Sequence, residues 1–151
     1  MNLRPFEEFA VGQRYRSNGT VTVTAERIKS FAAEFDPQPF HLDEEAAKST
    51  FFGELVASGW LTAAITMRLL VDSDMRPAGG NIGAGGEELR WPQPVRPGDM
   101  LRLEAEVVDV RPSRSRQDVG VVKVRLTTLN QRDEVVQRAT PTMIVLRRPT
   151  T

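Results

Sequence analysis

The sequence of 151 residues contains no cysteine, one histidine and one tyrosine. The absence of cysteine excludes disulfides, thiolate metal sites and cysteine nucleophiles together. With a single histidine, a metal ion would have to be held by carboxylates, so the composition argues against a metal centre.

The chain also lacks net charge and long hydrophobic runs. It has 20 Lys and Arg against 20 Asp and Glu, so bulk electrostatics favour neither nucleic acid nor an anionic membrane as a partner. The most apolar stretch, residues 59–71, is shorter than a membrane span of roughly 20 residues and carries Arg68. The N-terminus has no basic segment followed by an apolar run, so we expect a cytoplasmic protein. The length suits one domain over residues 1–151.

Two segments have helical patterns. Ile28, Phe31 and Phe35 fall on one face, which predicts a helix over residues 25–35 that ends before Pro37. Residues 59–71 (GWLTAAITMRLLV) are apolar or small almost all round, which is typical of a helix enclosed by other structure.

The remaining regular segments alternate apolar and polar residues, as strands do. Residues 11–24 carry a polar turn at 17–19 and then a Val-Thr run, which predicts one partly solvated strand. Three later segments with short polar linkers predict an antiparallel meander: residues 100–110, 119–129 and 135–146. Pro141 cannot donate to a ladder and should lie at a bulge or unpaired position. An antiparallel sheet with one apolar face and one apolar helix must wrap that helix, so we predict an α+β architecture.

Two further segments carry weak signals. Residues 79–86 are glycine-rich but match no phosphate-binding pattern, so we interpret them as a loop or bulge. Residues 111–116 (RPSRSR) are basic and could contact phosphates, although such a run is more often a solvated hairpin end.

The strongest candidate for chemistry is the stretch 34–47 (EFDPQPFHLDEEAA), which holds the only histidine. Asp36 and His41 are separated by two prolines, Pro37 and Pro39, which should stiffen the intervening loop. A carboxylate and an imidazole held close together can orient a water molecule and move its protons. The alternative is that Asp36 is a turn residue and His41 a structural group.

The second candidate is the start of the apolar helix, Ser58-Gly59-Trp60. Amides at a helix N-terminus lack intrahelical partners and can stabilise an oxyanion, and a glycine lets a substrate carbonyl approach the backbone. The alternative is that Ser58 is an N-cap and Gly59 a residue of tight packing.

Three motifs resemble those of a known family. The run DPQPFHLD (36–43) resembles the D-x-N-P-x-H-x-D signature of the MaoC-like dehydratases, the (R)-specific enoyl-CoA hydratases of the hotdog fold. Downstream, FGELVASGW (52–60) resembles the family's F-G-x-x-I-A-H-G-M, and PVRPGD (94–99) its P-V-x-x-G-D turn. Order and spacing agree over about residues 7–147.

The resemblance implies a fold, a reaction and an assembly. The fold would be a sheet wrapped round the helix 59–71, paired into a homodimer or a dimer of dimers with the site at the interface. Asp36 and His41 would match the catalytic pair that activates the water added to a trans-2-enoyl thioester, and the Gly59 amide would match the oxyanion donor. An acyl-CoA or acyl carrier protein thioester would be the substrate, and the resemblance implies no separate cofactor.

The sequence also departs from the family pattern. Gln38 replaces the asparagine, Phe35 the glycine before the acid, Ser58 the histidine before the oxyanion glycine, and Met67 a serine of the central helix. The acid, base and oxyanion donor remain, while Gln38, Phe40 and Trp60 would reshape the pocket. Two other functions stay open: a hotdog acyl-CoA thioesterase, for which the helix 59–71 offers no Asp or Glu, and a non-catalytic subunit that binds acyl thioesters.

Overall fold

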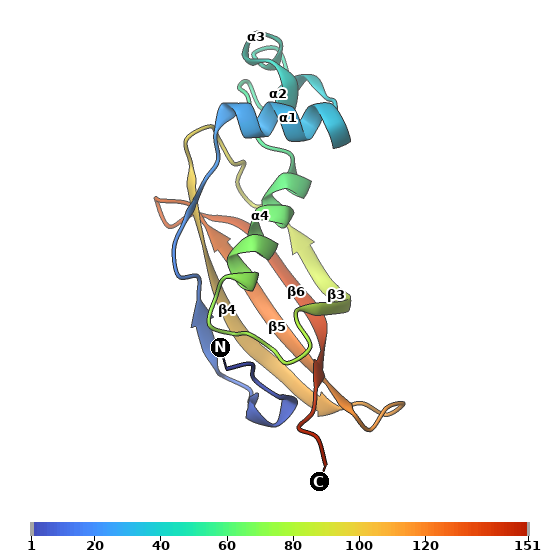
Figure 1. Cartoon of the computed structure of the whole chain (residues 1–151). Coiled ribbons are helices and arrows are strands. Elements are labelled where there is room, and N and C mark those ends of the chain that lie inside the picture. The colour runs from blue at the N-terminus through green and yellow to red at the C-terminus, as the bar shows by residue number, and fades with distance from the viewer. Residues whose placement is uncertain (1, 151) are drawn as a thin grey trace.

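The computed structural model of the chain describes residues 2–150. An antiparallel sheet carries the helix α4 on one face, and the helix α1 lies together with the short helices α2 and α3 at one end (Figure 1). In chain order the elements are η1 (Phe6–Glu8), β1 (Arg14–Arg16), β2 (Val21–Thr22), α1 (Ala25–Phe35), α2 (Pro39–Leu42), α3 (Glu44–Ala47), α4 (Gly59–Val71), β3 (Ile82–Arg90), β4 (Met100–Pro112), β5 (Val119–Leu129) and β6 (Val135–Leu146).

Helix α4 is the centre of the core, as its composition predicts. It begins at Gly59 and ends at Val71, the bounds expected from the sequence, and Ser58 caps it by accepting a hydrogen bond from the Trp60 amide. Its buried side chains pack in one cluster with the inward residues of β4, β5 and β6. On β4, Leu101, Leu103 and Ala105 are buried while the residues between them are half-buried, because successive side chains of a strand point to opposite faces.

The sheet order is β1-β4-β5-β6-β3, with β2 also paired to β4. The predicted antiparallel meander of β4, β5 and β6 is confirmed. The single strand expected within residues 11–24 is instead two short strands, because the turn at 17–19 divides the pairing with β4. A sheet wrapped round one central helix is the hotdog arrangement.

The glycine-rich segment corrects a prediction. Residues 82–90 form the edge strand β3, so the loop predicted for residues 79–86 is wrong there, whereas the alternative prediction of a bulge agrees with the register shifts against β6 between Gly83 and Gly86 and between Glu87 and Leu89. All nine residues of β3 are exposed, so the sequence has no hydrophobic alternation there to indicate a strand. Pro141 lies opposite Gly86, beside a register shift, as expected for a proline in the last strand.

The stretch 34–47 is more helical than expected. Helix α1 has the predicted bounds, with Thr24 as its N-cap and Asp36 as its C-cap. The segment between Asp36 and His41, predicted to be a loop, contains the short helix α2, with Pro39 in its first turn, where a missing amide hydrogen costs nothing. Asp43 then caps α3. No helix within residues 2–150 is long and apolar enough to cross a bilayer.

Candidate active site

Asp36 and His41 are brought into direct contact. Asp36 ends α1 and His41 lies on α2, and Asp36 Oδ2 is 3.2 Å from His41 Nε2. The side chain of His41 is 6% exposed, whereas that of Asp36 is 19% exposed. The short helix α2 thus turns the chain so that both groups face each other at one end of the core.

His41 is held by the extended segment that leads into α4. Its Nδ1 lies 2.7 Å from the carbonyl oxygen of Val56, and the Val56 amide donates to the carbonyl of Phe40 at 2.9 Å. A carbonyl oxygen only accepts, so Nδ1 carries a proton and donates it. In the neutral imidazole, Nε2 is therefore an acceptor that faces the Asp36 carboxyl group. The ring of Phe40 packs edge-on against the imidazole, with centroids 4.5 Å apart.

The carboxyl group of Asp36 is kept ionised by its neighbours. Partial burial by itself would raise the pKa of Asp36, but the side chains of Gln38 and Ser58, and the charge of His41 when the imidazole is protonated, lower the pKa below its ordinary value. The Gln38 amide nitrogen donates to Asp36 Oδ1, so Oδ2 is the oxygen left to face His41. Gln38 and Ser58 were both expected at the site; Gln38 donates directly to the acid, and Ser58 lies near enough to lower its pKa.

The N-terminus of α4 lies beside this pair. Ser58 is fully buried and caps the helix, as one interpretation of the sequence proposed. In the part of the chain that the structure describes, the Gly59 amide donates to no acceptor, as is usual for a first helical amide. A Cβ atom placed on Gly59 would lie 2.5 Å from Cε2 of the Trp91 ring, so this glycine is also a residue of tight packing.

His41 and Gly59 line a common cavity of about 620 Å³. Most of its walls are aromatic or aliphatic, and its remaining polar side chains are Thr62 and Gln93. The lining residues are Phe40, His41, Phe51, Phe52, Val56, Ala57, Gly59, Thr62, Trp91, Pro92, Gln93, Pro94, Val95 and Val136. An apolar cavity with a few convergent polar groups is the usual form of a small-molecule site.

The cavity differs from the sequence-based prediction in its aromatic residues. Phe40 is on its wall as expected, but Trp60 is not: its side chain is exposed and meets Trp91 edge-on, with ring centroids 5.4 Å apart. Trp91 takes the place expected of Trp60. In the sequence, Trp91 is recognised only as part of the Trp-Pro-Gln-Pro kink. Its place in the site could have been suspected because packing seldom requires a large aromatic residue in a turn.

No cluster of three or more potential metal ligands is formed by the His, Asp and Glu side chains of residues 2–150. The cavity wall includes the His41 imidazole and Gly59, and the carboxylate of Asp36, which does not line the cavity, contacts the imidazole. Together they can hold a small polar molecule against an apolar substrate, move a proton and stabilise an anion.

Fold and site together define a hotdog-fold protein with an acid–imidazole pair at the N-terminus of its central helix. The model of the MaoC like domain matches residues 7–130, and the chain belongs to this family. A MaoC-like dehydratase from Rhodospirillum rubrum has a similar structure, with a TM-score of 0.92 and 56% identity over 97% of this chain and 99% of that one. The fold inferred from the motifs is thereby confirmed.

Two relatives known by sequence extend the comparison. YdeM of Bacillus subtilis, an uncharacterized protein, is 36% identical over 84% of this chain and 88% of its own length. The 3-hydroxyacyl-thioester dehydratase Z of Mycobacterium tuberculosis is 31% identical over 83% of each chain. The chain therefore belongs to a family that contains dehydratases of hydroxyacyl thioesters.

Proposed function

We propose that the protein is a hydro-lyase that reversibly adds water to a trans-2-enoyl thioester and gives the (R)-3-hydroxyacyl thioester. The observation that carries this proposal is the contact of Asp36 Oδ2 with His41 Nε2 at 3.2 Å, where an imidazole that lines an apolar cavity meets a carboxylate. Membership of the MaoC-like family supports the same reaction class.

The tautomer of His41 suits the binding of water. Because Nδ1 donates to Val56, the neutral imidazole and the ionised Asp36 both present acceptors at the same place. The two acceptors are 3.2 Å apart, so no water fits between them, but a water molecule beside the pair can donate one O–H group to each. Water held in this way has its lone pairs directed outward, and it can attack C3 as one of the two residues takes its proton.

The Gly59 amide supplies the second half of the reaction. Addition of water at C3 moves electron density to the thioester oxygen, and an unpaired amide at the positive end of a helix dipole stabilises that developing charge. A proton then returns to C2 and regenerates the thioester. The reverse sequence eliminates water, so the same groups serve as a dehydratase.

The cavity suits the acyl part of the substrate. Its volume of about 620 Å³ and its Phe, Pro and Val walls favour an apolar chain over a pantetheine arm, whose amides would lack partners. The carrier of the thioester, CoA or acyl carrier protein, would lie outside this cavity.

A panel of enoyl-CoA thioesters that differ in length and branching tests the proposal by the loss of enoyl absorbance on hydration. Asp36→Asn and His41→Ala should each lower turnover about 10²- to 10⁴-fold, since each removes a general acid or base. Asp43→Asn makes the same chemical change seven residues further on, at the cap of α3, and should leave turnover intact.

Three results would contradict the proposal. One is full activity of both site variants, and another is release of free thiol from a saturated acyl-CoA without enoyl hydration, which would indicate a thioesterase. The third is tight binding of acyl-CoA with no turnover across the panel, which would indicate a binding subunit.

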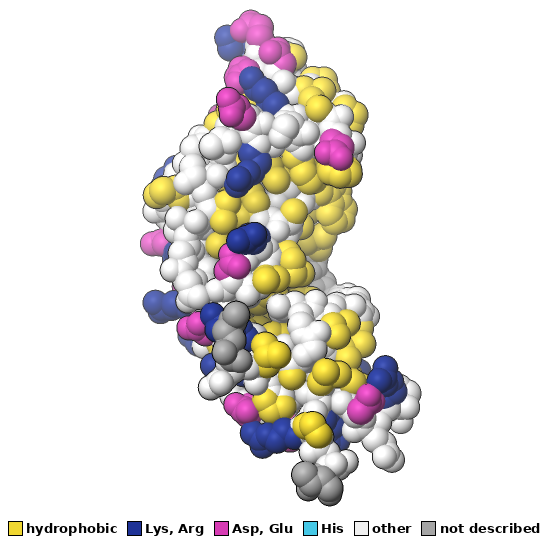
Figure 2. All heavy atoms as spheres, in the orientation of Figure 1, with side chains coloured by type: hydrophobic (Ala, Val, Ile, Leu, Met, Phe, Trp, Pro, Cys, Tyr) yellow, Lys and Arg dark blue, Asp and Glu magenta, His cyan; other side chains and the backbone are white. Residues whose placement is uncertain are grey.

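We also propose a homodimer that forms along β3. This strand is at the sheet edge with all nine residues exposed, and large apolar side chains of α4 are exposed on the same side: Trp60, Met67 and Val71. Figure 2 shows hydrophobic side chains gathered over α4, with charged ones mostly around them. Light scattering should report twice the mass of the chain, and Met67→Lys should shift it toward the monomer.

A further inference from the structure

Trp91 lies where the proposed reaction would take place. Its ring fills the space beside Gly59 so closely that a Cβ on Gly59 would come within 2.5 to 2.7 Å of three ring atoms. The same ring is part of the cavity wall that includes His41 and Gly59. Any group bound between the Gly59 amide and His41 must therefore lie against the indole or next to it.

The indole is held in this position by a buried hydrogen-bond network. Trp91 Nε1 donates to Gln137 Oε1 at 2.9 Å, and Gln137 Nε2 donates to Thr66 Oγ1 at 3.3 Å. Thr66 Oγ1 lies 2.6 Å from Thr128 Oγ1 and donates to the carbonyl of Thr62. Gln137, Thr66 and Thr128 are almost completely buried on β6, α4 and β5.

Such a network is costly to bury unless each group is paired, and it fixes the ring more firmly than apolar contact would. Trp91 is 41% exposed, but its indole N–H is paired with an acceptor from the core, which restricts the rotation of the ring. The network therefore orients the ring, and the ring in turn defines the shape of the space beside Gly59.

We propose that Trp91, oriented by Gln137, is a specificity-determining residue that excludes substituents at C2 of the enoyl thioester. This inference rests on the proposed function. If the thioester oxygen is bound by the Gly59 amide and water is held by His41, then C1, C2 and C3 span the distance from Gly59 to His41. C2, bonded to the carbonyl carbon, lies nearest the indole packed on Gly59, so a methyl group there meets the ring.

The test compares two substrates in the full-length protein: trans-2-butenoyl-CoA and its 2-methyl derivative. The parent should prefer the unbranched substrate, and Trp91→Leu should reduce the ratio of the two kcat/KM values about tenfold or more, which is the typical worth of one methyl group in a fitted pocket. The ratio does not depend on the fraction of folded enzyme, so a loss of stability alone cannot produce this change.

Two more variants separate ring volume from ring orientation. Trp91→Phe keeps a smaller ring and should give a ratio of the two kcat/KM values between those of the parent and Trp91→Leu. If Trp91→Leu does not fold, Trp91→Phe replaces it in the test. Gln137→Leu keeps the indole but removes its acceptor, so it should relax the ratio in the same direction by a smaller factor. Unchanged ratios in all three variants, with hydration retained, would overturn this inference alone. Absence of hydration in the parent would contradict the proposed function as well.

A double-mutant cycle tests the contact of Trp91 with Gly59. Gly59→Ala should lower kcat/KM for trans-2-butenoyl-CoA strongly in the parent, because the added Cβ displaces the indole, and only weakly in the Trp91→Leu background. An equal loss in both backgrounds would mean that glycine serves the approach of the substrate and not the packing of Trp91, and would contradict this placement of the ring.

Discussion

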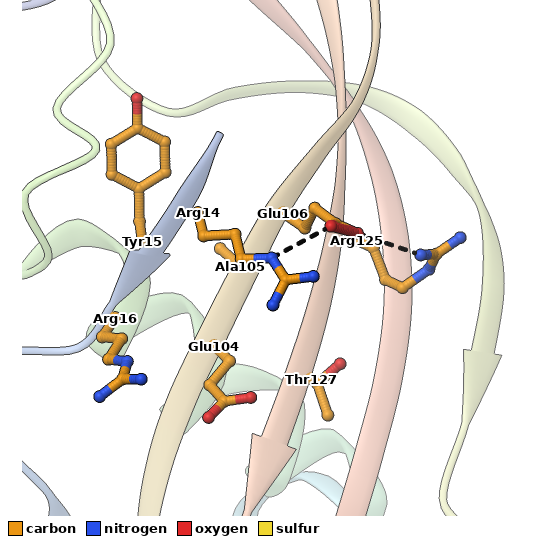
Figure 3. A pocket seen from close by; sticks show the side chains of 8 residues that line it. All are labelled: Arg14, Tyr15, Arg16, Glu104, Ala105, Glu106, Arg125 and Thr127. Atoms are coloured by element: carbon orange, nitrogen blue, oxygen red, sulfur yellow. Dashed lines mark hydrogen bonds and ion pairs between the residues drawn. The ribbon is translucent and has the colours of Figure 1, made fainter. Parts of the chain in front are cut away.

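The cavity beside His41 and the groove on the outer face of the sheet differ in the residues that line them: apolar ones in the cavity and charged ones in the groove. The cavity has apolar walls with a buried imidazole in contact with Asp36. The outer groove of about 180 Å³ lies over β1, β4 and β5, where Glu106 receives ion pairs from Arg14 at 3.3 Å and Arg125 at 3.4 Å (Figure 3). Paired charges in solvent are already screened and interact weakly with a ligand. A few polar groups in an apolar cavity interact with a ligand more strongly, because water does not screen them.

The largest effect on turnover is expected from substitution of Asp36 and His41. If Asp36 and His41 hold one water molecule together, loss of either disables the same step, and Asp36→Asn combined with His41→Ala should be no more than about tenfold slower than the worse single variant. Steady-state hydration of an enoyl-CoA measures this. A double variant whose loss is the product of the two single losses would show that the residues act separately.

The next largest effect is expected from the loss of Ser58, which caps α4 and also lowers the pKa of the Asp36 carboxyl group. Ser58→Ala should cost about 1 kcal/mol of folding free energy, as loss of an N-cap does, and should also raise the pKa of Asp36. Thr24→Ala removes the equivalent cap of α1 and should cost a similar amount without altering the pH profile of activity. Chemical unfolding and pH–rate profiles of both variants make the comparison, and an identical pH profile in Ser58→Ala would contradict the second role.

A smaller effect, on the pH dependence of activity, is expected from Gln38→Ala. Burial alone would raise the pKa of Asp36, and the Gln38 amide is the foremost of the contacts that lower it. Without that amide the pKa rises, so activity that needs the carboxylate is lost at a higher pH on acidification. The ionised Asp36 contributes stability that is present above its unfolded pKa and is lost as the pH falls through its folded pKa. In Gln38→Ala this loss should occur at a higher pH than in the parent.

The pH–rate profile of Gln38→Ala, recorded beside Gln117→Ala at the exposed β4–β5 hairpin, checks this. The Gln117 variant should match the parent. An acid limb in Gln38→Ala that is unmoved or shifted to lower pH would show that the amide does not stabilise the carboxylate.

The sequence predicted those features that depend on local pattern. The bounds of α1 and α4 followed from periodicity, capping and proline, and the contact of Asp36 with His41 followed from their spacing. It did not predict β3, because its side chains lie in solvent and leave no alternation. Nor could it predict the packing of Trp91 on Gly59, since that contact joins residues separated by 32 positions and depends on Gln137 of strand β6.

The smallest effect is expected on the outer face of the sheet. Glu106→Gln removes the carboxylate shared by Arg14 and Arg125, but these partners are largely exposed and already solvated, so the free energy of unfolding should change by less than about 0.5 kcal/mol. Because α4 and the sheet separate this groove from His41, turnover of an enoyl-CoA should also be unchanged. A marked loss of turnover in Glu106→Gln, with an unaltered unfolding curve, would show that the charged residues of the outer groove take part in substrate binding.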